Sequence, residues 1–215
     1  MEANIMPRVI IEGTRLTCKS DIAEKLTNNT RFQGPKKYRF HPGVISSEWV
    51  TISDKPWGRG LINFYPDEEN IAMRGYDAWV NLFERLPMCS WIIDRFHIST
   101  SVFQYITHNK TINFNWLERR LKKLNFIIVF CHRSSGTFQS AREDRVKISE
   151  NPHQYRDLNV YIEEQYLYEE FIKKSIIPSI KVDVSNNNIN GAVNKILDWY
   201  ESNSTLWPNV NKSMG

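Results

Sequence analysis

Residues 9–26, VIIEGTRLTCKSDIAEKL, carry a strand, a loop and a helix in the order of a phosphate-binding site. A short apolar run leads into Gly13, and Lys19 and Ser20 stand where the pattern G-x-x-x-x-G-K-[ST] has its lysine and its hydroxyl residue. In this pattern, backbone amides at a helix N-terminus hold phosphate oxygens, the lysine reaches the β- and γ-phosphates, and the hydroxyl ligates Mg²⁺. The stretch therefore predicts a nucleotide-phosphate site.

One letter of this loop departs from the pattern, because Cys18 stands where the second glycine is expected. That glycine allows the backbone to approach phosphate closely. A small side chain need not abolish binding, and we expect Cys18 to enter the following helix with ordinary backbone dihedrals.

The composition is that of a globular protein, with 41% hydrophobic and 24% charged residues over 215 positions. We expect one domain, 1–215, able to bury a full core. The net charge of +4 suits an anionic ligand such as a nucleotide, a phosphate or DNA. Three cysteines without metal-ligand spacing argue against a disulfide framework and a zinc site, and favour a cytoplasmic location. No apolar run is long enough to span a membrane, so no membrane partner is expected.

Apolar runs of strand length alternate with helical periodicity, which predicts an α/β fold with a mainly parallel sheet. The expected strands are 8–12, 37–40, 90–93, 126–131 and 179–184, and the expected helices are 19–27, 71–86, 99–105, 116–124, 159–174 and 190–200. Residues 34–66 form a long irregular connection in this interpretation. The polar segment at about 132–158 is expected to be a mobile lid, and residues 201–215 a frayed tail.

A second motif lies in WIIDRFHISTSVFQ, residues 91–104, where a buried strand ends in Asp94 and Arg95. The thymidylate kinase family has D-R-[YFH] at the end of its third strand and S-x-x-x-[YF]-Q on the next helix. Six residues of this chain match: Asp94, Arg95, Phe96, Ser99, Phe103 and Gln104. With the phosphate loop upstream, the chain resembles this family over almost its whole length.

The resemblance implies a three-layer α/β P-loop kinase with a five-stranded parallel sheet flanked by helices, plus a lid, that uses ATP and Mg²⁺. It assigns the ATP phosphates to the loop residues Gly13, Thr14, Arg15, Thr17, Cys18, Lys19 and Ser20, and the metal to Ser20 and Asp94. Arg95 and Arg39 would hold the acceptor, while Phe103 and Gln104 would stack on and read its base. Phosphoryl transfer needs mainly alignment and charge neutralisation, which a lysine, a metal and several arginines provide.

The lid carries three candidate arginines, Arg133, Arg142 and Arg145, of which the last two are three positions apart and so share one face of an expected helix. They resemble the lid arginines that close onto the phosphates in this family. The backbone from Ser185 to Asn188 is where the fold would pack adenine. On the helix 159–174, by contrast, the acidic pair Glu163 and Glu164 is expected to form a solvated face.

Two departures from the family leave the acceptor open. Arg15 and Leu16 occupy the place of an aspartate that binds the acceptor sugar, and RFHPG, residues 39–43, replaces R-E-P-G at the expected end of the second strand. Deoxynucleoside kinases, on a similar fold, have a glutamate there that acts as a base on a hydroxyl acceptor, and His41 could take that role.

The first expectation is therefore phosphoryl transfer to a pyrimidine deoxynucleoside monophosphate. The alternative is a hydroxyl acceptor, either a deoxynucleoside or 5-hydroxymethyluracil in DNA, as in kinases of some phages. A third possibility is a nucleotide- or DNA-binding module without catalysis. The family resemblance also suggests a homodimer.

Overall fold

The computed structural model describes residues 7–32, 43–52, 59–87 and 89–203, and these form a five-stranded parallel sheet in the order β2-β3-β1-β4-β5. The strands are β1 (Arg8–Glu12), β2 (Gly43–Ser46), β3 (Trp91–Asp94), β4 (Ile127–His132) and β5 (Ser179–Asp183). The first strand occupies the middle of the sheet, paired in parallel with β3 on one side and β4 on the other. Parallel strands buried on both faces explain the unbroken apolar runs of β1 and β4.

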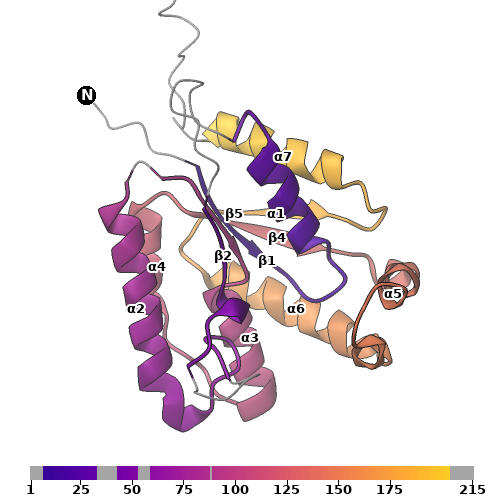
Figure 1. The fold of residues 1–215 in the computed structure, drawn as a ribbon, viewed down its shortest axis with the longest axis horizontal. Coiled ribbons are helices and arrows are strands. Elements are labelled where there is room, and N and C mark those ends of the chain that lie inside the picture. Colours follow the sequence, from indigo (N-terminus) through magenta and orange to yellow (C-terminus); the bar gives the residue numbers. More distant parts are fainter. Residues whose placement is uncertain (1–6, 33–42, 53–58, 88, 204–215) are drawn as a thin grey trace, which may run out of the picture.

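Helices cover both faces of the sheet and make three layers (Figure 1). They are α1 (Lys19–Asn28), α2 (Glu69–Arg85), α3 (His97–His108), α4 (Asn115–Lys123), α5 (Phe138–Val146), α6 (Asn159–Lys174) and α7 (Ile189–Asn203), with short 3₁₀ turns at Ser47–Trp49, Pro66–Glu68, Ser135–Thr137 and Pro152–Tyr155. Successive side chains of β1 point to opposite faces of the sheet, so they pack against different helix layers. Ile10 packs with α2, α3, α4 and α6, whereas Val9 and Ile11 pack with α1 and α7. The predicted fold class is confirmed.

The second strand is where the sequence-based assignment was wrong. β2 lies at Gly43–Ser46, inside the stretch 34–66 that was expected to be irregular. The segment expected as a strand, 37–40, lies outside the described residues, as do Arg39 and His41. Because His41 precedes β2 in the chain, it does not follow the second strand as the comparison with R-E-P-G had assumed.

A buried arginine lies at the amino edge of the sheet and was not predicted from the sequence. Arg8 begins β1, and its guanidinium donates to backbone carbonyl groups of Cys89, Leu124 and Pro87. These contacts satisfy polar groups at that edge. The loops that follow the carboxyl ends of the strands lie at the opposite edge, where ligands bind in open α/β sheets.

Candidate phosphate-binding site

The loop between β1 and α1 encloses the Lys19 ammonium group. Lys19 is almost fully buried, and its Nζ donates to the carbonyl oxygen of Thr14 at 2.7 Å. The Thr17 hydroxyl donates to the same carbonyl group at 2.7 Å. Burial, together with the positive charge of Arg95, lowers the pKa of Lys19 to about 8. An anion beside this poorly solvated cation would relieve the cost of its burial.

Nucleotide affinity should fall as the pH rises through 8, the pKa of Lys19 in the free protein. A bound phosphate favours the charged ammonium and raises its pKa, so above pH 8 binding must take up a proton. We expect the Kd of ATP, measured by titration calorimetry, to be nearly constant near pH 7 and to weaken by up to about tenfold per pH unit above about pH 8.

The matched control is Lys19→Arg, whose guanidinium stays charged throughout this range. Its pH dependence should disappear. If the arginine variant shows the same loss of affinity above pH 8, a group other than Lys19 is responsible.

The backbone of the loop adopts left-handed conformations at three positions: Gly13 (φ 148°), Leu16 (φ 65°) and Cys18 (φ 54°). The expectation that Cys18 has ordinary dihedrals was therefore wrong. Cys18 keeps the backbone conformation that a glycine adopts without strain, at a cost of about 1–2 kcal/mol for a residue with a Cβ.

Replacing Cys18 by glycine should stabilise the protein. Relief of the left-handed strain outweighs the extra chain entropy of glycine, so we expect a gain of about 0.5–1 kcal/mol in the free energy of unfolding by urea. Cys18→Ala keeps the Cβ and its strain, and serves as the control that gains nothing. Equal losses of stability in both variants would mean that the thiol contacts matter more than the strain.

The strained loop is held from the other side by Arg133, which is fully buried at the end of β4. Its guanidinium donates to the carbonyl oxygens of Leu16 (2.7 Å) and Ser185 (3.2 Å) and to Oδ1 of Asn187, and lies 3.5 Å from Sγ of Cys18. Arg133 thus positions the phosphate loop against the segment at 185–187. It also lines the cavity described below, so its contact with ATP remains a prediction.

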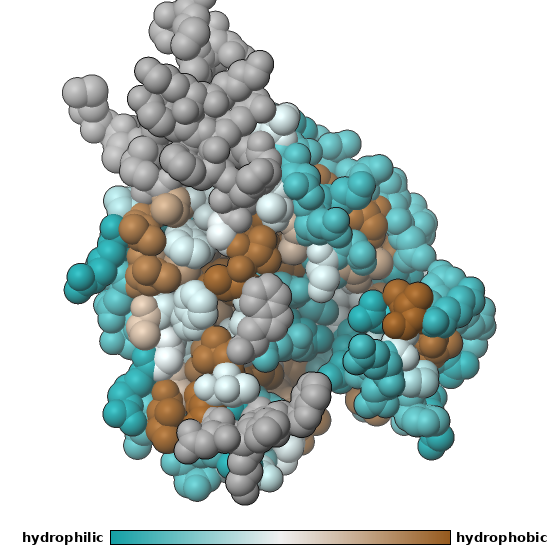
Figure 2. Space-filling view, in the orientation of Figure 1, coloured by the Kyte–Doolittle hydropathy of each residue, from teal (hydrophilic) through white to brown (hydrophobic). Residues whose placement is uncertain are grey.

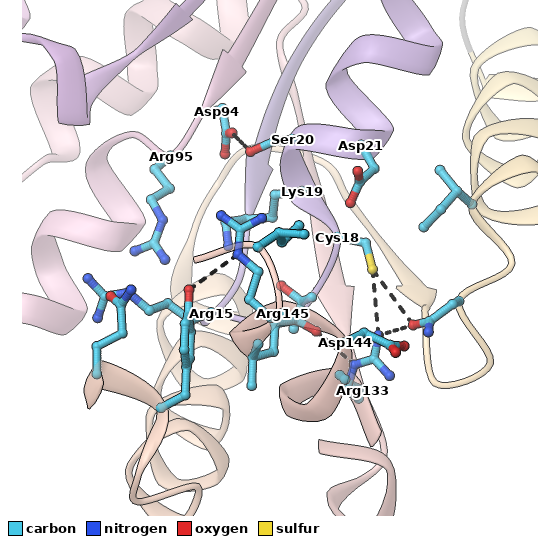
Figure 3. Close-up of a pocket in the computed structure, with 18 of the residues that line it drawn as sticks. Arg15, Cys18, Lys19, Ser20, Asp21, Asp94, Arg95, Arg133, Asp144 and Arg145 are labelled. Atoms are coloured by element: carbon cyan, nitrogen blue, oxygen red, sulfur yellow. Dashed lines mark hydrogen bonds between the residues drawn. The ribbon is translucent and has the colours of Figure 1, made fainter. Parts of the chain in front are cut away.

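Ser20 and Asp94, the two residues expected to hold Mg²⁺, lie side by side, and the Ser20 hydroxyl donates to Oδ2 of Asp94 at 2.8 Å (Figure 3). The other carboxylate oxygen of Asp94 is buried and has no hydrogen-bond partner among the described residues. A hydroxyl beside an oxygen with unused lone pairs fits Mg²⁺, which binds through few protein groups together with substrate phosphates. No cluster of three or more acidic, histidine or cysteine side chains suited to a metal occurs in the described part of the chain.

Arg95 follows Asp94, and both residues line the cavity (Figure 3). Its backbone is left-handed (φ 64°), and its side chain is largely buried. Nε lies 3.1 Å from Oε1 of Glu48, a residue just beyond the carboxyl end of β2 whose side chain is 50% exposed. The predicted acceptor arginine is therefore already paired with a carboxylate.

These groups line an open cavity of about 630 Å³ at the carboxyl edge of the sheet. In the space-filling view, the segment around α5 stands out as a mostly hydrophilic lobe, and the surface is hollowed between this lobe and the rest (Figure 2). Both sides contribute charged side chains to the lining, which includes Arg15, Lys19, Asp21, Glu48, Asp94, Arg95, Arg133, Asp144 and Arg145.

The two lid arginines on α5 differ in whether they reach the cavity. Arg145 reaches the cavity, and its Nε lies 3.4 Å from the Tyr155 hydroxyl (Figure 3). Arg142 is half-buried and is not among the described residues that line the cavity. Of the stretch 185–188 expected to pack adenine, Asn187 lines the cavity, together with the neighbouring Ile189, whereas the Ser185 hydroxyl donates to Asp183.

The two residues expected to recognise the base lie elsewhere in this arrangement. Gln104 is fully buried, and its Nε2 donates to the carbonyl oxygens of Ile62 (3.2 Å) and Phe64 (2.8 Å). Phe103 lies edge-on to the His108 ring. Among the residues that the structure describes, neither lines the cavity.

Two carboxylates that contact predicted site residues were not identified as site residues by the sequence analysis: Glu48, paired with Arg95, and Glu164. Glu48 would have been a candidate if β2 had been placed correctly. Glu164 on α6 accepts a hydrogen bond from the Thr14 hydroxyl, so it faces the phosphate loop and not solvent as expected. Only the three-dimensional contact identifies Glu164, since Thr14 is 150 residues away in the chain.

No protein-family profile matches the chain, and no curated protein matches it in sequence. Its fold, however, is found in solved structures. YorR from Bacillus subtilis, determined with phosphorylated GDP, is 15% identical with a TM-score of 0.59, over 90% of this chain and 95% of YorR. Thymidylate kinase from Candida albicans is 13% identical with a TM-score of 0.54, over 93% and 92% of the two chains.

This chain has the fold of the P-loop kinases. Deoxyadenosine kinase from M. mycoides with bound dATP is also similar, at 14% identity and a TM-score of 0.51, over 90% of this chain and 98% of the kinase. At these identities the likeness concerns the P-loop kinase fold. In the described part of the chain, no helix has the length and apolar character needed to cross a membrane.

Proposed function

We propose that the chain is a kinase that transfers the γ-phosphoryl group of ATP, with Mg²⁺, to a hydroxyl group of a pyrimidine deoxynucleoside, either free or within DNA. The observation that carries this proposal is the Glu48–Arg95 pair, 3.1 Å apart, on the wall of the cavity that also holds Lys19. A carboxylate at this position repels a phosphate acceptor but can accept the proton of a hydroxyl group. Glu48 therefore favours a hydroxyl acceptor over a phosphate acceptor.

Each part of the site has a role in such a transfer. Lys19 and the loop amides would stabilise negative charge on the migrating phosphoryl group, and Ser20 with Asp94 would hold Mg²⁺, which neutralises charge on the phosphates when bound. Arg95 would orient the acceptor oxygen, and Glu48 would take its proton. Arg145, on the lobe across the cavity, would exclude water when that lobe closes. The choice of a pyrimidine rests on the family resemblance alone.

The experiment is a transfer assay with γ-³²P-ATP and Mg²⁺ against thymidine, deoxycytidine, dTMP, and DNA with and without 5-hydroxymethyluracil. We expect label on a hydroxyl acceptor. We also expect Glu48→Gln to lower kcat by about 10²-fold without changing the Kd of ATP, because a general base accelerates proton transfer by at least about that factor. Glu24→Gln, an exposed carboxamide substitution on α1, is the matched control.

Other outcomes point to the two alternatives. Label on the phosphate of dTMP, with full activity in Glu48→Gln, would establish the monophosphate kinase and leave Glu48 as an ion-pair partner of Arg95. ATP binding without transfer to any acceptor would favour the non-catalytic binding module.

A further inference from the structure

The last residue of β1, Glu12, is a fully buried carboxylate that lies outside the cavity lining described above. Its Oε1 accepts hydrogen bonds from the backbone N–H groups of Phe96 (3.0 Å) and Ile98 (3.2 Å), and its Oε2 accepts one from the Ser99 hydroxyl. Ser99 is in turn 2.8 Å from the Tyr168 hydroxyl on α6. Three donors from one short segment thus converge on a single carboxylate.

These donors belong to the first turn of α3, where N–H groups lack partners within the helix. A carboxylate also interacts favourably with the positive end of the helix dipole. Side chains often fill this place from within the same segment. Here the partner comes from β1, 84 positions from Phe96 in the sequence, so the start of α3 is fixed to the strand that leads into the phosphate loop.

The residue immediately before this turn is Arg95, in its left-handed conformation. Such a conformation is strained in a residue other than glycine and persists only where the surroundings enforce it. The enforcing contacts are visible: the Arg95 N–H donates to the Ile11 carbonyl at 3.0 Å, and its carbonyl accepts from the Ser47 N–H at 3.3 Å. Glu12 fixes the next residues and thereby completes the restraint.

We propose that Glu12 is a positioning residue, which holds the Arg95 turn in its left-handed conformation so that the Arg95 guanidinium faces the cavity beside Lys19. The functional part of this inference rests on the proposed kinase activity, in which Arg95 orients the acceptor. The structural part does not, because the conformation of Arg95 can be observed without any substrate.

The first measurement is hydrogen exchange at Nε–H of Arg95, followed by NMR and assigned by the loss of its signal in Arg95→Lys. We expect slow exchange in the wild type, where this group is buried beside Glu48. Glu12→Asp keeps the carboxyl group but is one methylene shorter, and should accelerate the exchange at least about tenfold by releasing the turn. Glu12→Gln can still accept from both amides and donate to Ser99, so it should keep the protection.

The second measurement is a double-mutant cycle on kcat. If Glu12 acts through Arg95, Glu12→Asp should lower kcat by about 10²-fold, and Arg95→Lys should then cost less than about twofold more in that background. Unchanged exchange at Arg95 in Glu12→Asp would overturn the proposal, as would an equal cost of Arg95→Lys in both backgrounds. If the wild type transfers phosphate to nothing, the kinase proposal fails, while the exchange data still decide the role of Glu12.

Discussion

Replacement of Lys19 by alanine is expected to lower phosphoryl transfer by about 10³-fold, the scale on which kinases lose rate when a charge that stabilises the transferring group is removed. Lys19 Nζ is buried in the phosphate loop, where its partner in the protein is a neutral carbonyl group. In such poorly hydrated surroundings, a positive charge stabilises the charge that develops on phosphate oxygens far more than it would in water.

The same substitution should leave the fold intact. Burial lowers the pKa of Lys19, which means that the buried charged ammonium destabilises the folded protein. Its removal should therefore keep or raise the melting temperature. Steady-state kinetics and thermal unfolding of Lys19→Ala therefore separate loss of catalysis from loss of structure. Lys25→Ala, at an exposed position of α1, is the control. Full turnover in Lys19→Ala would mean that the loop does not hold the reacting phosphate.

Replacement of Gly13 by alanine is expected to destabilise the protein by about 2–4 kcal/mol, the sum of backbone strain and overpacking. A Cβ on Gly13 would lie 2.6 Å from the backbone carbonyl oxygen of Cys131 in β4, at a φ of +148° that side chains rarely adopt. Cys131 belongs to a buried strand and cannot move without disturbing the sheet. We expect the melting temperature to fall by on the order of 10 °C.

Gly136 provides the matched control for this experiment. A Cβ added there meets no described atom within 4 Å, so Gly136→Ala should leave the melting temperature unchanged. If Gly13→Ala is as stable as the wild type but has lost ATP binding, the loop has moved away from β4, and the close contact with Cys131 is not essential to the fold.

Several features of this protein follow from its sequence because they depend on local patterns. β1 and β4 are continuous apolar runs, and a lysine and a serine after a glycine loop begin a helix. The meeting of Ser20 and Asp94 follows from two motifs and the geometry of a parallel sheet, whose carboxyl ends share one edge.

Other features depend on contacts between distant segments and could not be predicted. β2 has four residues, GVIS, which form too short a pattern to compete with the apparent motif just before it. The contact of Cys18 with Arg133 joins residues 115 positions apart. Gln104 matches the family motif, yet its side-chain amide donates hydrogen bonds to the backbone carbonyl groups of Ile62 and Phe64.

Arg133 also determines which part of the chain can move. Its N–H and carbonyl groups are both bonded to the Gln165 side chain on α6, each at 2.8 Å, while its guanidinium is fixed to the phosphate loop. A residue restrained at its backbone and at its side chain cannot act as a hinge. We expect rotation of the α5 lobe to begin beyond Arg133, so that the lobe can open for nucleotide exchange while the phosphate loop keeps its shape throughout the cycle.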